Sequence, residues 1–271
     1  MQLRPKLGVK IANEPVTYSE AVQELLKSFS ANPWFIHEYW PMNEERMAMI
    51  IRDANAHAPG GTAFEVGCGV GHIAYLLGRC GYRVSATDAS RPPERNALFE
   101  RAGVRFLPSN LNDLELFPEL APHSFDVIVL GEVIEHILNH PFGLVKRLAE
   151  LLRPGGLMIV DTPNACTLWN GWRMITNKYS LWGTHHFIHE PKLKDGKVIS
   201  IGEIHYHEYS PAELRGLLES AGLTVLTTRF LPCGIYDSQS WAKRTAKRLL
   251  WPLLHTRLFG AGQYILATKR S

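Results

Sequence analysis

The stretch that decides the fold is FEVGCGVGH, residues 64–72. The apolar run that leads into it is typical of a short buried strand, and helical spacing of apolar residues begins at His72. Between them lie Gly67, Gly69 and Gly71. A glycine loop of this kind brings backbone N–H groups close to a ligand, and the helix that follows adds a positive end. We therefore expect a ligand-binding loop between a strand and a helix.

Strand and helix patterns alternate on the carboxyl side of this loop. Strands are expected at 62–67, 82–88, 104–110, 125–132, 157–164, 223–230 and 262–269, and helices at 72–81, 142–156 and 209–222. Helix-like spacing also occurs at 17–31 and 43–57, joined by the aromatic and proline-rich NPWFIHEYWPMN. Alternating strands and helices favour an α/β fold with a mainly parallel sheet that is covered on both faces.

Length and composition indicate one globular domain with an embellishment. The chain has 271 residues, of which 45% are hydrophobic and 20% charged. Neither a signal-like amino terminus nor an apolar run of about 18 residues is present, so secretion and membrane spanning are not expected. The cysteines lie far apart with no CxxC pair, at Cys68, Cys80, Cys166 and Cys233. This pattern suits a reducing, cytoplasmic location.

An acid after the second strand narrows the choice of ligand. Asp88 lies 21 residues after Gly67, where a carboxylate can accept hydrogen bonds from both hydroxyls of a ribose. A pyrophosphate loop needs glycine at position 72, where this chain has His72. Glu65 would also repel a pyrophosphate, whereas it would attract an ammonium group. These residues favour S-adenosylmethionine over NAD.

Four motifs in order resemble the class I S-adenosylmethionine-dependent methyltransferases. They are FEVGCGVG, TDAS, GEVIEH and LLRPGGLMIVDTPN, within residues 60–231. The resemblance implies a seven-stranded Rossmann-like sheet with an antiparallel last strand in a methyltransferase domain at 59–271, and the helix-like patterns before it predict a helical cap at 1–58. It also implies a set of cofactor-binding residues. These are Glu65, Gly67, Cys68, Gly69, Gly71, Asp88, Ala89, Asn110, Leu111 and Glu132, although aspartate is commoner in the family at the position of Asn110.

The residues after the fourth strand indicate the acceptor atom. Related enzymes that methylate base amines have an Asn/Asp-Pro-Pro-aromatic motif there, whereas this chain reads GEVIEH. An oxygen nucleophile fits better, because carboxylates and histidines can take its proton. Candidate catalytic residues are Glu132, His136 and His207. Ubiquinone-biosynthesis O-methyltransferases have a similar Glu-x-x-Glu-His.

The same motif leaves metal binding open. It is also similar to the small-RNA 3′-end 2′-O-methyltransferases, in which two glutamates, this histidine and a downstream histidine hold a divalent cation. The corresponding ligands here are Glu132, Glu135 and His136 with His205 or His207. Such a set suits manganese, iron or zinc better than magnesium. In the alternative, metal-free interpretation, the acid lies near the methionine moiety and the histidine near the substrate.

Residues 165–209 form a long connection that we expect to be a lid. Long loops in compact domains are usually lids or binding loops, and the tryptophans of this one can stack on a sugar or an aromatic ring or fill a local core. His185, His186 and His189 suit a pocket lining or surface better than a metal site. Similar inserts occur in bacterial glycan methyltransferases. Saccharides, quinone-like phenols, lipid precursors and other small hydroxyl compounds all remain candidate acceptors.

The carboxyl-terminal part is basic. No acid follows Asp237, while seven cations do, four of them at 243, 244, 247 and 248. The segment 238–258 therefore suits either a solvated cationic face or weak contact with a membrane surface. The rest of the chain is slightly acidic, so nucleic acid is not an expected partner. A metal-dependent RNA 2′-O-methyltransferase and an inactive cofactor-binding scaffold are the alternatives to a small-molecule O-methyltransferase.

Overall fold

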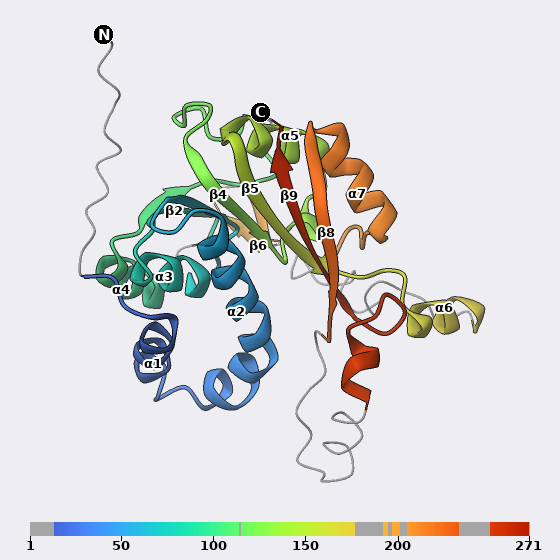
Figure 1. The fold of residues 1–271 in the computed structure, drawn as a ribbon, viewed down its shortest axis with the longest axis horizontal. Coiled ribbons are helices and arrows are strands. Elements are labelled where there is room, and N and C mark those ends of the chain that lie inside the picture. Colours follow the sequence, from blue (N-terminus) through green and yellow to red (C-terminus); the bar gives the residue numbers. More distant parts are fainter. Residues whose placement is uncertain are drawn as a thin grey trace.

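The computed structural model describes residues 14–90, 92–113, 115–176, 192–194, 197–200, 205–232 and 250–270. Its centre is a seven-stranded sheet in the order β3-β2-β1-β4-β5-β9-β8 (Figure 1). The strands are β1 Thr62–Val66, β2 Arg83–Asp88, β3 Arg105–Pro108, β4 Phe125–Gly131, β5 Leu152–Pro163, β8 Leu223–Leu231 and β9 Gly262–Lys269. Strands β1 to β5 are parallel, and β9 is antiparallel to both of its neighbours. The predicted fold class is confirmed.

Helices cover both faces of this sheet. One layer contains α1 Tyr18–Ser28, α2 Trp40–His57, α3 His72–Arg79 and α4 Pro93–Ala102, and the other contains α5 Pro141–Leu151 and α7 Pro211–Ser220. Apart from these lie α6 Leu168–Ile175 and a hairpin of β6 Lys192–Lys194 with β7 Lys197–Ser200. No helix in the described ranges is long and apolar enough to cross a bilayer.

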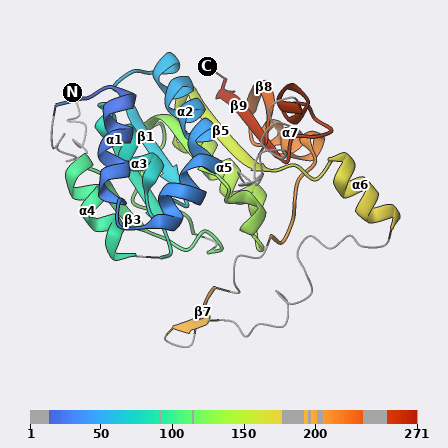
Figure 2. The ribbon, with the colours of Figure 1, turned by 90° about the horizontal axis from the view of Figure 1, so that it is seen from below.

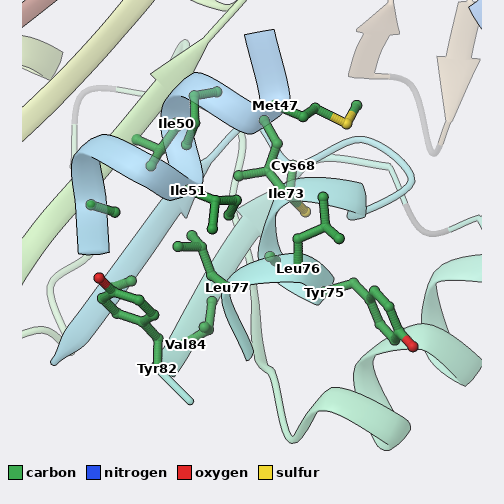
Figure 3. Close-up of a cluster of buried hydrophobic side chains, with 14 of the residues drawn as sticks. Met47, Ile50, Ile51, Cys68, Ile73, Tyr75, Leu76, Leu77, Tyr82 and Val84 are labelled. Atoms are coloured by element: carbon green, nitrogen blue, oxygen red, sulfur yellow. The ribbon is translucent and has the colours of Figure 1, made fainter. Parts of the chain in front are cut away.

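Alternation along the central strands divides the core in two. Val127 and Val129 of β4 pack toward α2 and α3, whereas Ile128 and Leu130 pack toward α5 and α7. Figure 3 shows the first cluster, in which side chains of α2 such as Ile51 meet those of α3. Because both faces of β4 are buried, residues 127–130 of this strand form an unbroken apolar run, as expected for a parallel sheet.

The amino-terminal helices differ in detail from the sequence expectation. The stretch expected to interrupt the helices instead forms a π-helical turn, η1 Phe35–Tyr39, that runs directly into α2. Its Phe35 is buried and stacks on Phe29 with ring centroids 4.2 Å apart, which stabilises the turn. Pro41 lies directly after this turn, at the second residue of α2. The boundary between cap and methyltransferase domain stays a prediction.

Two helices were not expected from the sequence. Helix α4 fills the connection between β2 and β3, and α6 lies inside the segment predicted as an irregular lid. Thr167 caps α6, accepting a hydrogen bond from the backbone N–H of Asn170 at 3.1 Å. The eight-residue α6 is too short for helical periodicity to be seen among its neighbours.

Candidate functional site

The glycine loop joins β1 to α3 with backbone that only glycine adopts easily. Gly67 has φ +74° and Gly71 φ +88°, both in the left-handed region. A Cβ atom on Gly67 would lie 2.3 Å from Val133 Cγ2, and one on Gly71 would lie 2.3 Å from Phe99 Cε1. By contrast, a Cβ on Gly69 would meet no described atom within 4 Å. The middle of the loop is therefore open to a ligand, while both of its ends pack against the protein.

Asp88 holds this loop from the end of β2. One of its carboxylate oxygens accepts a hydrogen bond from the N–H of Gly69 at 2.7 Å, and the other accepts from the N–H and hydroxyl of Ser90. Ala89 lies between them and is exposed. Asn110 and Leu111 follow the neighbouring strand β3, which pairs with β2 through Asp88 and Pro108. Because parallel strands end at one edge, the predicted ribose and adenine contacts lie beside the glycine loop.

Arg95 of α4 ties these turns together, although the sequence gave no signal for it. Its guanidinium is fully buried and donates to the carbonyls of Gly69, at 3.0 Å, and Ser90, at 2.5 Å. The same group lies 3.7 Å from the sulfur of Cys68. Burial raises the pKa of the Cys68 thiol, so this side chain is a packing group rather than a nucleophile. Only the fold brings α4 to the loop.

Glu65 is the acid that precedes the loop, at the end of β1. Its side chain is buried and accepts a hydrogen bond from the N–H of Ala74 in the first turn of α3, at 2.7 Å. Burial raises the pKa of this carboxyl to about 8, against the opposing effect of that hydrogen bond and of Arg46. A ligand ammonium group would stabilise the charged form. The residues around the loop therefore fit the amino-acid end and ribose of S-adenosylmethionine.

A second group of charges lies where β4 and β5 end. Asp161 is buried, and its carboxylate pairs with the guanidinium of Arg46 from α2 at 2.7 Å. Burial opposes the charge on Arg46, but Asp161 and Glu132 outweigh it and raise the pKa of Arg46. Asp161 could have been found in the sequence as an acid at the end of a predicted strand. Arg46 could not, because its role depends on how α2 packs.

Glu132 has an unusual backbone for its type. Its φ is +53°, in the left-handed region, and its N–H donates to the carbonyl of Asp161 at 2.8 Å. Burial raises the pKa of its carboxyl to about 7, Arg46 opposes this, and Asp161 adds to it. Within the described residues, no donor reaches Glu132 Oε1 or Asp161 Oδ2. Glu132 therefore has a carboxylate oxygen available to accept from a bound group.

Glu135, His136 and His205 form the third group, with potential ligand atoms within 4.8 Å of one another. Glu135 and His136 lie in the 3₁₀ turn η2 Ile134–His136, and the rings of His136 and His205 meet edge to face with centroids 4.8 Å apart. Glu208 contacts His205 Nδ1 at 3.1 Å. Such a group can hold a divalent cation or take a proton from a substrate.

Glu135 joins this group to the sheet and to the segment before α7. Its carboxylate accepts a hydrogen bond from the hydroxyl of Thr162 at 2.7 Å, and its backbone carbonyl accepts from the N–H groups of Tyr206, at 2.7 Å, and His207. Burial, followed by the charge of Glu132, raises the pKa of the Glu135 carboxyl. These contacts hold His205 beside the turn.

The side chain of His207, the other candidate ligand, lies elsewhere. It is half exposed, 3.8 Å from a carboxylate oxygen of Glu213, with its ring against Tyr209. The structure thus brings His205, but not the imidazole of His207, to Glu135 and His136. His185, His186 and His189 lie outside the described residues.

A cavity of about 670 Å³ adjoins these groups. Glu132 and Glu208 lie in its wall, and so do aromatic and apolar side chains of α6 and of the segment before β9. The full lining is Glu132, Pro163, Asn164, Thr167, Leu168, Trp169, Asn170, Trp172, Arg173, Glu208, Leu258, Phe259 and Ala261. A pocket with mostly apolar walls and a few polar side chains suits a small organic molecule.

Comparison with known proteins agrees with this geometry. The profile of a family described as a methyltransferase domain matches residues 37–228. A ubiquinone biosynthesis O-methyltransferase of Caulobacter vibrioides is 35% identical over 129 residues, which is 45% of this chain and 50% of that protein. The chain spans about half the length of the curated Caulobacter relatives that it matches.

Solved structures share the fold at low identity. The 1,6-didemethyltoxoflavin-N1-methyltransferase of Burkholderia thailandensis, which holds S-adenosylhomocysteine, superposes with a TM-score of 0.52 at 18% identity, over 96% of this chain and 93% of that one. A SAM-dependent methyltransferase of Archaeoglobus fulgidus gives a TM-score of 0.54 at 18% identity, over 83% of this chain and 94% of that one. At such identities the likeness establishes the fold alone.

Proposed function

Because the chain belongs to the methyltransferase-domain family, the class I S-adenosylmethionine-dependent methyltransferases, we propose that it methylates an oxygen atom of a small molecule, lipid precursor or saccharide. The observation that carries this proposal is the turn that follows β4. Val133 packs against Gly67 of the glycine loop, and the adjacent Glu132 lines the cavity. A methyl donor on the loop and an acceptor in the cavity meet at this turn.

S-adenosylmethionine supplies a methyl group that its sulfonium has already activated. We assign the ammonium end to Glu65, the ribose to Asp88, and the methionine moiety to the loop around Gly69. These assignments are supported by the buried carboxyl of Glu65 and the open space beside Gly69. The remaining proposed contacts are Gly67, Cys68, Gly71, Ala89, Asn110, Leu111 and Glu132.

The chain's own residues then align the acceptor and remove its proton. The acceptor oxygen forms a bond to the methyl carbon while the carbon–sulfur bond breaks and the sulfur keeps the electron pair. Glu132 accepts a hydrogen bond from the acceptor hydroxyl at the cavity wall. The proton passes to His136 or His205, and we favour His205 over His207 because its ring lies against that of His136, whereas the ring of His207 lies against Tyr209.

A metal-assisted form is the second candidate. It is supported by the close approach of Glu135, His136 and His205, and by Glu135 Oε1, to which no described residue donates a hydrogen bond. With Glu132 as a further ligand, this donor set suits manganese, iron or zinc, and a bound cation would supply Lewis acidity beside the acceptor. An RNA 2′-hydroxyl is the alternative acceptor in this form.

The activity is tested in two steps with the full chain. Titration calorimetry with S-adenosylmethionine comes first, and an absence of binding at millimolar concentration would contradict the proposal. Release of S-adenosylhomocysteine is then measured with phenols, saccharides and a short RNA. Binding without transfer to any of them would indicate the inactive scaffold.

Paired histidine variants test the proposed base. We expect His205→Ala to lower kcat by about 100-fold or more, the usual contribution of a general base, whereas His207→Ala keeps most of the activity. Equal losses in the two variants would contradict the assignment. Calorimetry with Mn²⁺ on the wild type and on His136→Ala separates the metal-dependent form from the metal-free one without relying on turnover.

A further inference from the structure

Arg95 is a buried cation that has no part in the proposed reaction. It lies on α4, which packs against α3 near the β3 edge of the sheet (Figure 2). In the described chain its guanidinium meets carbonyl oxygens, a sulfur and aromatic faces rather than a carboxylate, and no described group accepts from its Nε. An apolar side chain of similar volume would fill this space at a lower cost of desolvation. Packing alone therefore does not account for an arginine here.

The hydrogen bonds of Arg95 join two separate turns of the cofactor site. Its Nη1 donates to the carbonyl of Gly69, in the loop after β1, and its Nη2 donates to the carbonyl of Ser90, in the turn after β2. Both nitrogens belong to one planar group with a fixed geometry. The guanidinium therefore sets the distance between the two carbonyls.

Aromatic rings hold the guanidinium in this position. Its central carbon lies 3.9 Å from the ring centroid of Phe106, on β3, and 5.8 Å from that of Phe99, on α4. A cation is attracted to the face of an aromatic ring, and more strongly where water is excluded. The ring of Phe99 also packs against Gly71 at the far end of the glycine loop. The group that bridges the turns is thus itself fixed by the core.

Asp88 joins the same two turns, but its carboxylate is also the proposed ribose ligand. It already accepts three hydrogen bonds, from the N–H of Gly69 and from the N–H and hydroxyl of Ser90. A carboxylate offers about four acceptor positions, so two ribose hydroxyls would displace at least one of these donors. The hydrogen bonds from Arg95 end on carbonyls, so a ribose on Asp88 leaves them in place. Arg95 can keep the two turns together while Asp88 binds the ligand.

We infer that Arg95 is a positioning residue of the cofactor site. It fixes the spacing between the loop around Gly69, which takes the methionine moiety, and the turn at Asp88, which takes the ribose. The inference rests on the proposed function for these two assignments. A ligand that spans both turns benefits from a spacing that is set before it binds, because less of the protein has to be ordered on binding. A ligand held by one turn gains much less.

Two ligands of different length test this inference by titration calorimetry on the full chain. S-adenosylhomocysteine spans both turns, whereas 5′-methylthioadenosine has the ribose and lacks the amino-acid end. We expect Arg95→Met to raise the Kd for S-adenosylhomocysteine by about tenfold or more, and that for 5′-methylthioadenosine by about threefold or less. Calorimetry reports the Kd apart from the fraction of protein that binds. A role in folding alone would lower that fraction and leave the ratio of the two Kd values unchanged.

Two further variants keep the test independent of folding. Arg95→Lys keeps the charge but carries it on a single nitrogen, which cannot bridge both carbonyls as the guanidinium does, so we expect an intermediate Kd for S-adenosylhomocysteine. Arg79→Met is the matched control. Arg79 is also a buried arginine, but it lies in the last turn of α3, away from the glycine loop, and pairs with Glu24 at 2.8 Å. This control should lose stability in thermal unfolding and keep the Kd of both ligands.

Three results would overturn the inference. They are an unchanged Kd for S-adenosylhomocysteine in both Arg95 variants, an equal loss of affinity for the long and the short ligand, and an equal change of the two Kd values in Arg79→Met. Failure of the proposed function has a different signature, because the unsubstituted protein would then bind neither ligand.

Discussion

The two halves of the site are built differently. After β1 and β2, backbone makes the site: Gly67 adopts a left-handed conformation, and Asp88 holds the loop through an N–H group. After β4 and β5, charged side chains form the site: Arg46, Asp161 and Glu132 interact under burial, and three carboxylate oxygens, those of Glu132, Glu135 and Asp161, lack a described donor. A region that holds one constant ligand can be rigid and local, whereas a region that handles protons needs ionisable groups whose pKa can change.

Of the substitutions that test this contrast, removal of the Arg46 guanidinium should have the largest effect. We expect Arg46→Met to lower the free energy of unfolding by about 3–5 kcal/mol, because it leaves Asp161 and Glu132 buried without a counter-charge. Burial already raises the folded pKa of Glu132 above its unfolded value, so this acid costs stability as the pH rises from about 4.5 toward 7. The loss should therefore be larger at about pH 8 than at about pH 5, as measured by denaturant unfolding.

A double variant is the control for this prediction. Arg46→Met with Asp161→Asn removes one acid together with the cation, and we expect it to recover part of the lost stability. A loss that is independent of pH, or no recovery in the double variant, would show that Arg46 acts through packing rather than charge.

Alanine substitutions at two positions of the glycine loop should have distinguishable effects. Gly71→Ala places Cβ against Phe99, so we expect a loss of about 2–4 kcal/mol from overpacking and left-handed strain. Gly69→Ala meets open space and carries only the left-handed strain of φ +50°, so we expect a loss of about 1–2 kcal/mol in stability, but weaker S-adenosylmethionine binding. Thermal unfolding and calorimetry measure the two quantities. Equal losses of stability in both variants would contradict the division of the loop.

This contrast also explains what the sequence could predict. The glycine loop and the pair Glu135 and His136 each lie within a few residues of sequence, and Asp88 follows the loop at a set distance, so spacing could predict that they come together at one edge of the sheet, while their roles stay predictions. The choice between His205 and His207 depends on which imidazole lies beside the 3₁₀ turn after β4. The two residues are only two positions apart in the sequence, so their spacing cannot decide this. Arg46 lies in a helix whose own pattern shows only apolar periodicity, so its function follows from packing that no short motif records.

The secondary structure likewise could be predicted where the signal is local and not where it depends on tertiary packing. Central strands such as β4 could be predicted from their apolar runs, because both faces of the sheet are buried. Helix α6 was not predicted, because its eight residues are too few for the spacing of apolar side chains to stand out from the segment around it. The π-helical turn before α2 depends on Phe35 stacking in a tertiary cluster, which local propensity does not report.

The smallest expected effect concerns Glu65, beside the glycine loop. Burial raises the pKa of Glu65 to about 8, so this carboxyl is mostly protonated at about pH 7 in the free protein. A bound ammonium group favours the carboxylate, so S-adenosylmethionine binding should release a fraction of a proton at that pH and tighten as the pH rises from about 5.5 to 7. Calorimetry in buffers of different ionisation enthalpy measures the release.

Glu65→Gln keeps the shape and removes the titration. We expect this variant to bind about tenfold more weakly at about pH 7 and to lose the proton release, while Asp88→Asn weakens binding but keeps the release. If Glu65→Gln still released the proton, its source would lie among the acids after β4 and β5. Binding at the glycine loop would then change the protonation of the acids after β4 and β5. The two regions would not be electrostatically independent, and the division drawn between them would fail.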